Sequence, residues 1–435
     1  MMRKKIVMIG AGSAVFTKGL VLDIIDRSKE KWHIALVDID EHALDTIRVV
    51  CQKMIAQKEA DVELSWSVDR KDVLANADYV VSTIGVGGRR AWEQDVFIPR
   101  KYGVFQPVGD TVGPGGISRA MRMIPQLVDI ANDIKKLCPD AVFINYANPM
   151  TMNCMAIRRA TGVPVIGLCH GVKNGLRRVS KFLEIPQSEI RYTACGLNHM
   201  VFCYHMRRNG EDLMPFFVDK LSRTDPVGRP IGRLTEDSVR YDHAYVVSDD
   251  RHFSEFVPAM TADRAYYGVN LGVEAFSFEG TIAEGDREFA SYEAYASDDR
   301  PLPKEFFEYE EGEHEQLLDM IGALHEDRQE IYYVNLPNNG AVQNLPDATV
   351  IERPALFSGS GIQPVQLTDF PTYLLPPMMH YAATYEVAVT AALTGDVKLM
   401  ECAVEQATIP LGREAISSMV AELLKAHKEY LPQFA

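Results

Sequence analysis

The sequence predicts an α/β protein with a doubly wound, Rossmann-type domain over residues 1–195 and a mixed α+β domain over residues 196–435. Two observations carry this prediction. A short apolar strand at residues 4–9 runs directly into a glycine turn. Further apolar stretches of strand length, separated by enough chain for a helix each time, follow at residues 34–40, 77–84, 141–146 and 163–168.

The first strand and its turn predict a dinucleotide site. Glycines let the backbone approach a pyrophosphate closely, and the start of the following helix offers N–H donors. The second strand runs into Asp38, which can bind ribose hydroxyls. Val15 stands where a third glycine is usual, and Asp38 could instead cap a helix over residues 42–57. The residues predicted to contact NAD are Gly10, Gly12, Ser13, Phe16, Thr17 and Asp38.

The loops after the next two strands are expected near the nicotinamide, because ligands of open parallel sheets sit outside the carboxyl ends of the strands. Asn148 follows the strand at 141–146 and is predicted to contact a substrate hydroxyl. Its alternative role is that of a turn former before Pro149. Between these strands, Gly109–Ile117 is too rich in glycine and proline for a helix interior, so we expect a functional loop.

Cys169 and His170 follow a short strand at residues 163–168, and the string from Cys195 to His199 follows another at residues 191–194. A thiolate and an imidazole from neighbouring strand ends could hold one divalent cation, with water or substrate in its remaining positions. Each residue also has a structural interpretation, since cysteine is often a small buried hydrophobe. The common zinc patterns Cys-x-x-Cys and His-Glu-x-x-His do not occur in the chain.

In the carboxyl-terminal half, residues 242–258 combine tyrosine, aspartate, arginine and histidine within an apolar frame. This composition suits a cleft, or a solvated turn before a helix. Residues 280–330 are acidic and are expected to be helical and exposed. Short strands and two terminal helices, which we expect to pack back on the first domain, complete the chain at residues 331–335, 348–353, 377–393 and 416–430.

Composition argues against several kinds of partner. Lys and Arg total 45 against 60 Asp and Glu among 435 residues, a net charge of −15. We therefore expect neither nucleic acid nor an anionic membrane surface as a partner. The seven cysteines lack the dense spacing of a disulfide scaffold, and no apolar run approaches the roughly twenty residues of a membrane helix. A cytoplasmic protein is expected.

Together the motifs resemble glycoside hydrolase family 4, the NAD-dependent glycosidases, over essentially the whole chain. Their order along the chain makes the resemblance specific. The strings that carry it are Gly10-Ala11-Gly12-Ser13 with Phe16-Thr17, Asp38-Ile39-Asp40, Gly109-Asp110-Thr111, Gly113-Pro114-Gly115-Gly116, Asn148-Pro149, Cys169-His170-Gly171-Val172, Gly196-Leu197-Asn198-His199, and Asn335 with Asn344-Leu345-Pro346.

The resemblance implies that Cys169 and His199 hold a manganese-type cation, that Asn148 contacts the sugar, and that NAD stays bound. It also implies a mechanism outside the usual two-carboxylate scheme. In that family the sugar is oxidised at C3, the ketone acidifies the C2 proton, a base removes it, and the C1 substituent leaves by elimination. Water then adds and the hydride returns to C3, so no cofactor is consumed.

The resemblance leaves the base and the acid open. In relatives that act on 6-phospho sugars the base is a tyrosine, in a stretch that this chain matches poorly; Tyr245 and Asp250 are the candidates, with Tyr245 preferred. A tyrosine starts from a pKa of about 10 and needs the cation to act near neutral pH. One subgroup has an aspartic acid after the metal cysteine as leaving-group acid. His170 stands there in this chain and could donate that proton or shape the pocket.

The four-residue string that begins at Cys169, Cys-His-Gly-Val, is similar to Cys-His-Ser-Val of α-galactosidases and Cys-His-Glu-Val of α-galacturonidases. The small Gly171 leaves room for a charged C5 substituent. Arg89, Arg90 and Arg251 are candidates to bind a uronic carboxylate. An α-glucuronide or α-galacturonide is the predicted substrate, and a neutral α-galactoside or α-glucoside is the alternative. The family also implies homodimers or homotetramers.

Two other classes of protein share the glycine loop and the sheet. A lactate or malate dehydrogenase-like oxidoreductase, whose fold we expect this chain to share, would release reduced cofactor and need no cysteine ligand. A regulatory protein that only holds a dinucleotide would show no metal dependence. Aglycone release without net NADH separates the glycosidase from both.

Overall fold

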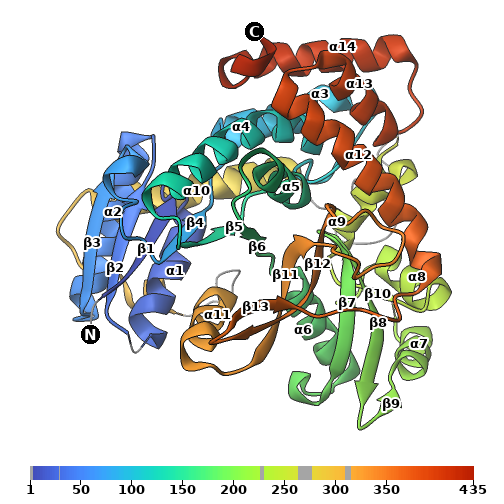
Figure 1. The fold of residues 1–435 in the computed structure, drawn as a ribbon, viewed down its shortest axis with the longest axis horizontal. Coiled ribbons are helices and arrows are strands. Elements are labelled where there is room, and N and C mark those ends of the chain that lie inside the picture. The colour runs from blue at the N-terminus through green and yellow to red at the C-terminus, as the bar shows by residue number, and fades with distance from the viewer. Residues whose placement is uncertain (1–2, 29, 226–229, 263–276, 309–314) are drawn as a thin grey trace.

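The computed structural model describes residues 3–28, 30–225, 230–262, 277–308 and 315–435, and one sheet runs through it (Figure 1). The amino-terminal strands are parallel, in the order β3-β2-β1-β4-β5-β6. This is the doubly wound arrangement, so the predicted fold class is confirmed. The parallel strands are β1 (Lys4–Ile9), β2 (Trp32–Val37), β3 (Val62–Ser67), β4 (Tyr79–Ser82), β5 (Val142–Asn145) and β6 (Val165–Gly167).

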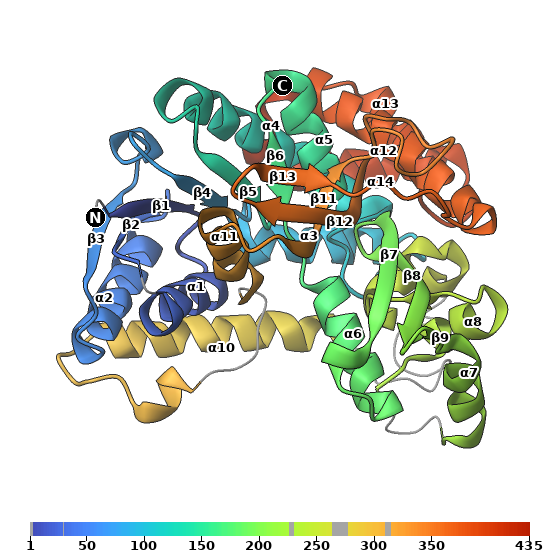
Figure 2. The same ribbon diagram turned by 60° about the horizontal axis from the view of Figure 1, so that its bottom comes forward.

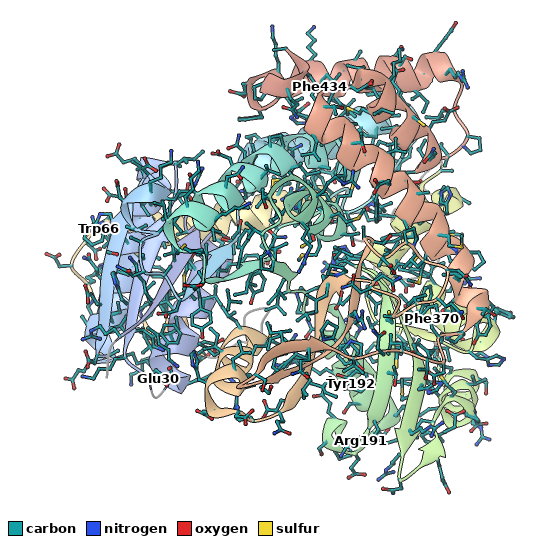
Figure 3. The ribbon with its side chains drawn as sticks, in the orientation of Figure 1. Glu30, Trp66, Arg191, Tyr192, Phe370 and Phe434 are labelled. Carbon is teal, nitrogen blue, oxygen red and sulfur yellow. The ribbon has the colours of Figure 1, made fainter. Side chains whose placement is uncertain are left out.

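Antiparallel strands continue the same sheet beyond β6, so both halves of the chain contribute to it. The order continues through β11, β12, β7 and β8 to β10. Trp66 on the edge strand β3 and Tyr192 on β7 mark the parallel and antiparallel sides (Figure 3). The antiparallel strands are β7 (Arg191–Leu197), β8 (Met200–Arg208), β9 (Glu211–Asp212), β10 (Tyr245–Val246), β11 (Glu330–Pro337), β12 (Val350–Ser358) and β13 (Gly361–Pro364).

Helices cover both faces of the parallel strands, because these strands are apolar on both sides. Ile6 and Met8 of β1 pack with α1 and α2, whereas Val7 and Ile9 pack with α4 and α5. The acidic helix α10, expected to be exposed, lies along α2 and buries Tyr292 (Figure 2). These helices are α1 (Ala14–Arg27), α2 (Glu41–Gln57), α3 (Gly88–Arg100), α4 (Gly113–Leu137), α5 (Met150–Thr161) and α10 (Phe278–Ala296).

The carboxyl-terminal helices lie against helices of the first half: α12 contacts α4 and α5, and α14 contacts α3 (Figure 1). Among the helices that the structure describes, none combines the length and the apolar composition required to cross a bilayer. The remaining helices are α6 (Gly171–Leu183), α7 (Met214–Arg223), α8 (Arg233–Tyr241), α9 (Asp250–Phe253), α11 (Glu315–Glu326), α12 (Leu375–Thr394), α13 (Val397–Gln406) and α14 (Arg413–Ala426).

The glycine-rich segment differs in part from the expected loop. Gly113–Gly116 form the first turn of α4, and Pro114 stands at the helix start, where the missing N–H costs nothing. A Cβ at Gly116 would lie 2.4 Å from the carbonyl carbon of Thr111. Close packing of the helix start against its own loop therefore accounts for the glycines.

Candidate active site

A pocket of about 300 Å³ lies where the loops after β4, β5 and β6 meet. Thr83 follows β4, Asn148 follows β5 and Cys169 follows β6, and all three line the pocket. Phe16 of α1 and Thr281 of α10 complete its wall. The site therefore stands at the carboxyl ends of the parallel strands, as the sheet topology predicts.

The glycine turn that is predicted to bind the nucleotide lies directly against Asp38. Gly10 has a φ of +90°, and the N–H of Gly12 donates to Oδ2 of Asp38 at 2.7 Å. A Cβ at Gly12 would lie 2.7 Å from the same oxygen. Burial raises the pKa of Asp38. Asp40, rather than Asp38, caps α2 by accepting the N–H of His42 at 3.0 Å, so the capping alternative for Asp38 is wrong.

The other residues predicted for the nucleotide follow the turn. Ser13 stands at the N-cap of α1, and Thr17 donates from Oγ1 to the carbonyl of Ala11 at 2.7 Å, which ties the turn to the helix. The ring of Phe16 lies 5.5 Å from that of Tyr146, and both rings line the pocket.

His199 occupies the two-residue turn between β7 and β8, with a φ of +67°. Ser248 holds the turn by donating from Oγ to the carbonyl of His199 at 2.7 Å. Burial, aided by the nearby His252, lowers the pKa of His199 to about 3. The imidazole is therefore neutral and keeps a lone pair for a cation.

Hydrogen bonds decide which nitrogen of His199 carries that lone pair. The hydroxyl of Thr111 donates to Oδ1 of Asp110 at 2.7 Å and lies 2.9 Å from Nδ1 of His199. Because the single hydroxyl hydrogen goes to Asp110, Nδ1 must be the donor to Thr111. This tautomer leaves Nε2 of His199 available as a ligand atom.

Asp110, His199 and His252 each offer one ligand atom, and these atoms lie within 4.8 Å of one another. Burial alone would raise the pKa of Asp110, but His252, His199 and Arg119 outweigh burial and lower it. A carboxylate and two imidazoles at this spacing suit a divalent cation. Cys169 lines the same pocket, and the N–H of Gly171 points at its sulfur at 3.3 Å.

Asn148 is placed beside this cluster. The side-chain amide of Asn148 donates to Oδ2 of Asp110 at 2.9 Å. Nε of Arg119 donates to the backbone carbonyl of Asn148 at 3.1 Å. His170 lines the pocket at the N-terminus of α6. The structure thus brings Asn148, Cys169, His170 and His199, predicted from separate motifs, into one pocket.

Neither base candidate lies where it can touch a molecule in this pocket. Tyr245 is 1% exposed, donates from its hydroxyl to the carbonyl of Gly175 at 3.1 Å, and has a pKa raised by burial. Asp250 accepts the N–H of Leu234 at 2.8 Å and the hydroxyl of Thr235 at 2.6 Å, so it holds the start of α8. Structural hydrogen bonds explain both residues, and we correct their assignment as the base.

Of the three candidate arginines, two lie outside the pocket lining and one lies in it. Arg89 and Arg90 of α3 both pair with Asp286 of α10 at 2.6 Å, outside the pocket lining. These ion pairs link α3 to α10, and because neither arginine lines the pocket, we correct their assignment to the substrate. Arg251 does line the pocket and pairs with Asp249 at 2.9 Å.

Sequence reasoning missed Asp110, Arg119 and His252 as individual site residues. Asp110 lay within a glycine-rich string, and His252 within the polar run at residues 242–258, so both motifs were noticed without assigning the side chain. Nothing in the sequence around Arg119 indicates a site residue, because an arginine early in a helix resembles a surface residue.

Comparison with known proteins identifies the family. The family model described as "Family 4 glycosyl hydrolase" matches residues 5–185. The model described as "Family 4 glycosyl hydrolase C-terminal domain" matches residues 194–406. An α-galactosidase of Rhizobium meliloti is 31% identical over 99% of this chain and 90% of its own length. An α-galacturonidase of Thermoanaerobacterium saccharolyticum is 30% identical over 98% of this chain and 96% of its own length.

Solved structures agree on the fold. A 6-phospho-α-glucosidase from gut microorganisms, in complex with NAD and Mn²⁺, superposes with a TM-score of 0.85 at 16% identity and covers all of both chains. A malate dehydrogenase of Cryptosporidium parvum reaches a TM-score of 0.54 at 15% identity, over 90% of this chain and 99% of its own. The dehydrogenase-like fold is thus confirmed, and the chain belongs to family 4 of the glycosyl hydrolases.

Proposed function

We propose that the chain hydrolyses non-phosphorylated α-glycosides, preferring α-glucuronides or α-galacturonides, with NAD and a divalent cation such as Mn²⁺ as cofactors. One observation carries the proposal: a single pocket is lined by Phe16 on the nucleotide side, by Cys169 and His199 as metal-type donors, and by Arg251. Its volume of about 300 Å³ suits a small molecule.

The residues of the turn fit NAD. Gly10 and Gly12 keep the backbone free of side chains beside Asp38, whose carboxylate can accept ribose hydroxyls. The solved 6-phospho-α-glucosidase of the same fold contains NAD and Mn²⁺. When bound, NAD supplies a hydride acceptor and donor for C3 of the sugar.

The donor set fits a divalent cation. His199 and His252 each offer an imidazole nitrogen, Asp110 offers a carboxylate oxygen and Cys169 a sulfur, which are atoms that bind first-row metals. When bound, Mn²⁺ supplies positive charge for the anion that loss of the C2 proton creates. Thr111 fixes the ring of His199, and Asn148 fixes the carboxylate of Asp110.

The remaining pocket residues support the substrate class. Asn148 is placed to contact a sugar hydroxyl, and the guanidinium of Arg251 can pair with a carboxylate on C5. A Cβ at Gly171 would meet only the sulfur of Cys169, at 3.4 Å, so the site leaves space beside the metal-type donors. We propose that His170 lies beside the leaving group, where it either donates a proton to it or forms part of the pocket wall.

We propose a homodimer or homotetramer of this chain in the cytoplasm, with no nucleic acid or membrane partner. None of the seven cysteines forms a disulfide, which supports a reducing compartment.

The purified protein, with NAD⁺ and Mn²⁺ under reducing conditions, tests the function with p-nitrophenyl α-glucuronide, α-galacturonide and α-galactoside. We expect p-nitrophenol release from a uronide without accumulation of NADH, and loss of activity after chelation. If the enzyme prefers the α-galactoside, the proposed uronide substrate is wrong and the proposed reaction still stands. Stoichiometric NADH would identify a dehydrogenase, and inactivity on every sugar with intact NAD binding would identify a binding protein.

Arg251→Met tests the carboxylate contact. We expect kcat/KM on the uronides to fall by about 10- to 100-fold, because a charge-assisted pair is lost, with a change below about threefold on the α-galactoside. Arg89→Met, which removes a surface ion pair with Asp286, is the matched control and should leave both sugars unaffected. An equal loss on charged and neutral sugars would remove Arg251 from carboxylate recognition.

A further inference from the structure

The glycine-rich motif Gly109–Gly116 is built around a buried carboxylate outside the pocket lining. Glu255 is 2% exposed and accepts the backbone N–H groups of Val108 and Gly109, each at 2.7 Å. Its second oxygen accepts Nε2 of Gln106 at 3.2 Å. Burial raises the pKa of Glu255 to about 8, although the three donors act in the opposite direction.

Gln106 extends these contacts to the far end of the motif. Its Nε2 also donates to the carbonyl of Val112 at 2.8 Å, and its Oε1 accepts the N–H of Gly115 at 2.8 Å. A Cβ at Gly113 would lie 2.7 Å from Nε2 of Gln106, and one at Gly115 would lie 2.7 Å from the carbonyl oxygen of Gly109. The glycines let the chain wrap tightly around the Gln106–Glu255 pair.

Glu255 also belongs to the turn that carries two pocket residues. Arg251 and His252 precede Glu255 by four and three positions, within the consecutive helical turns of α9 and of Ser254–Phe256. One carboxylate therefore joins the backbone directly before Asp110 to the turn that carries His252. Farther from the pocket, a β-bridge between Val104 and Ala262 also joins these two segments, and the N–H of Phe105 donates to the carbonyl of Thr261 at 2.7 Å.

We propose that Glu255 is a positioning residue that sets the spacing of Asp110 and His252 around the cation. The inference deepens the metal part of the proposed function and rests on it. Asp110 follows Gly109 immediately, so a shift of the loop moves its carboxylate relative to His252 and His199. Partners that hydrogen-bond directly to metal ligands typically change metal affinity by about 10- to 100-fold when lost. Glu255 acts one residue farther away, through the backbone N–H of Gly109.

The test measures Mn²⁺ affinity by electron paramagnetic resonance and NAD affinity by calorimetry, on the full chain without any sugar. We expect Glu255→Ala to weaken Mn²⁺ binding by about tenfold or more, and NAD binding by less than about twofold. Glu255→Gln should lose less, because one oxygen still accepts the two N–H groups while its amide faces the amide of Gln106. If the alanine variant does not fold, the Mn²⁺ affinity of Glu255→Gln tests the proposal in its place.

Leu423→Ala is the control for general destabilisation, since Leu423 is a fully buried core residue of α14, away from the glycine-rich motif. It should lower the melting temperature and leave Mn²⁺ affinity unchanged below that temperature. Unchanged Mn²⁺ affinity in both Glu255 variants, or parallel losses of Mn²⁺ and NAD affinity, would overturn the proposal. Because no sugar is present, a wrong substrate class cannot produce either result.

Discussion

His199→Ala is expected to lower kcat/KM on the preferred glycoside by about a thousandfold or more, because a cation in the pocket contributes several kcal/mol of charge stabilisation. His199 is a proposed ligand whose ring and backbone are both held by hydrogen bonds. Ser248 holds its carbonyl, Thr111 takes its Nδ1–H, and burial keeps the ring neutral. Alanine removes Nε2 and leaves the turn between β7 and β8 intact.

Mn²⁺ titration of the same variant separates this effect from misfolding. We expect Mn²⁺ affinity to fall with activity while NAD affinity is retained. His205→Ala is the matched control, because His205 of β8 pairs with Asp369 at 3.5 Å at the surface, outside the pocket lining. A variant at position 199 that binds Mn²⁺ normally and remains inactive would show that the residue acts in some other way.

Asp95→Ala should cause the largest loss of stability, about 3–5 kcal/mol in the free energy of unfolding, because it leaves a buried charge without its partner. Asp95 and Arg122 are both 0% exposed, and Nη1 of Arg122 donates to Oδ1 of Asp95 at 2.8 Å. Nε2 of His427, after α14, lies 3.0 Å from the same oxygen. The substitution therefore loosens α3, α4 and the carboxyl-terminal helices together.

Chemical denaturation measures this loss, and Glu93→Ala is the control. Glu93 lies on the same helix but pairs with the exposed Arg90 at 2.9 Å, so its loss should cost at most about 1 kcal/mol. Burial alone would raise the pKa of Asp95, whereas Arg122 and His427 lower it overall. The contribution is thus complete above the ordinary aspartate pKa of about 3.9 and is lost as the pH falls through the lowered value. Equal effects of the two variants would contradict this account.

The parallel half of the sheet could be predicted because its strands are continuous apolar runs that end at glycine, asparagine or aspartate. Strand β3 was missed, since Val62–Ser67 alternates apolar and polar residues at a solvent-facing edge. The start of α4 could not be predicted, because glycine and proline in Gly113–Gly116 are typical of loops and nothing in the string shows that the glycines fit the helix start against Thr111. Helix α13 (Val397–Gln406) was also not anticipated.

The site residues, too, could be predicted where they follow strands and could not be predicted where their positions depend on tertiary contacts. Asn148 and Cys169 could be placed because they follow strands whose ends must meet, and the family resemblance supplied the partner of Cys169. Asp110 and His252 come from a loop and a short helical turn, whose distance apart depends on Glu255 rather than on local sequence. Asp250 was misjudged because a buried carboxylate that holds a helix start resembles a catalytic one in sequence.

The measurement that tests the central claim most directly is hydrolysis in heavy water, with the released sugar analysed by mass spectrometry and NMR. Oxidation at C3 followed by elimination removes the C2 hydrogen and returns one from solvent, so we predict a product with deuterium at C2. Retention of the original C2 hydrogen during aglycone release would mean direct displacement at C1 and would contradict the account.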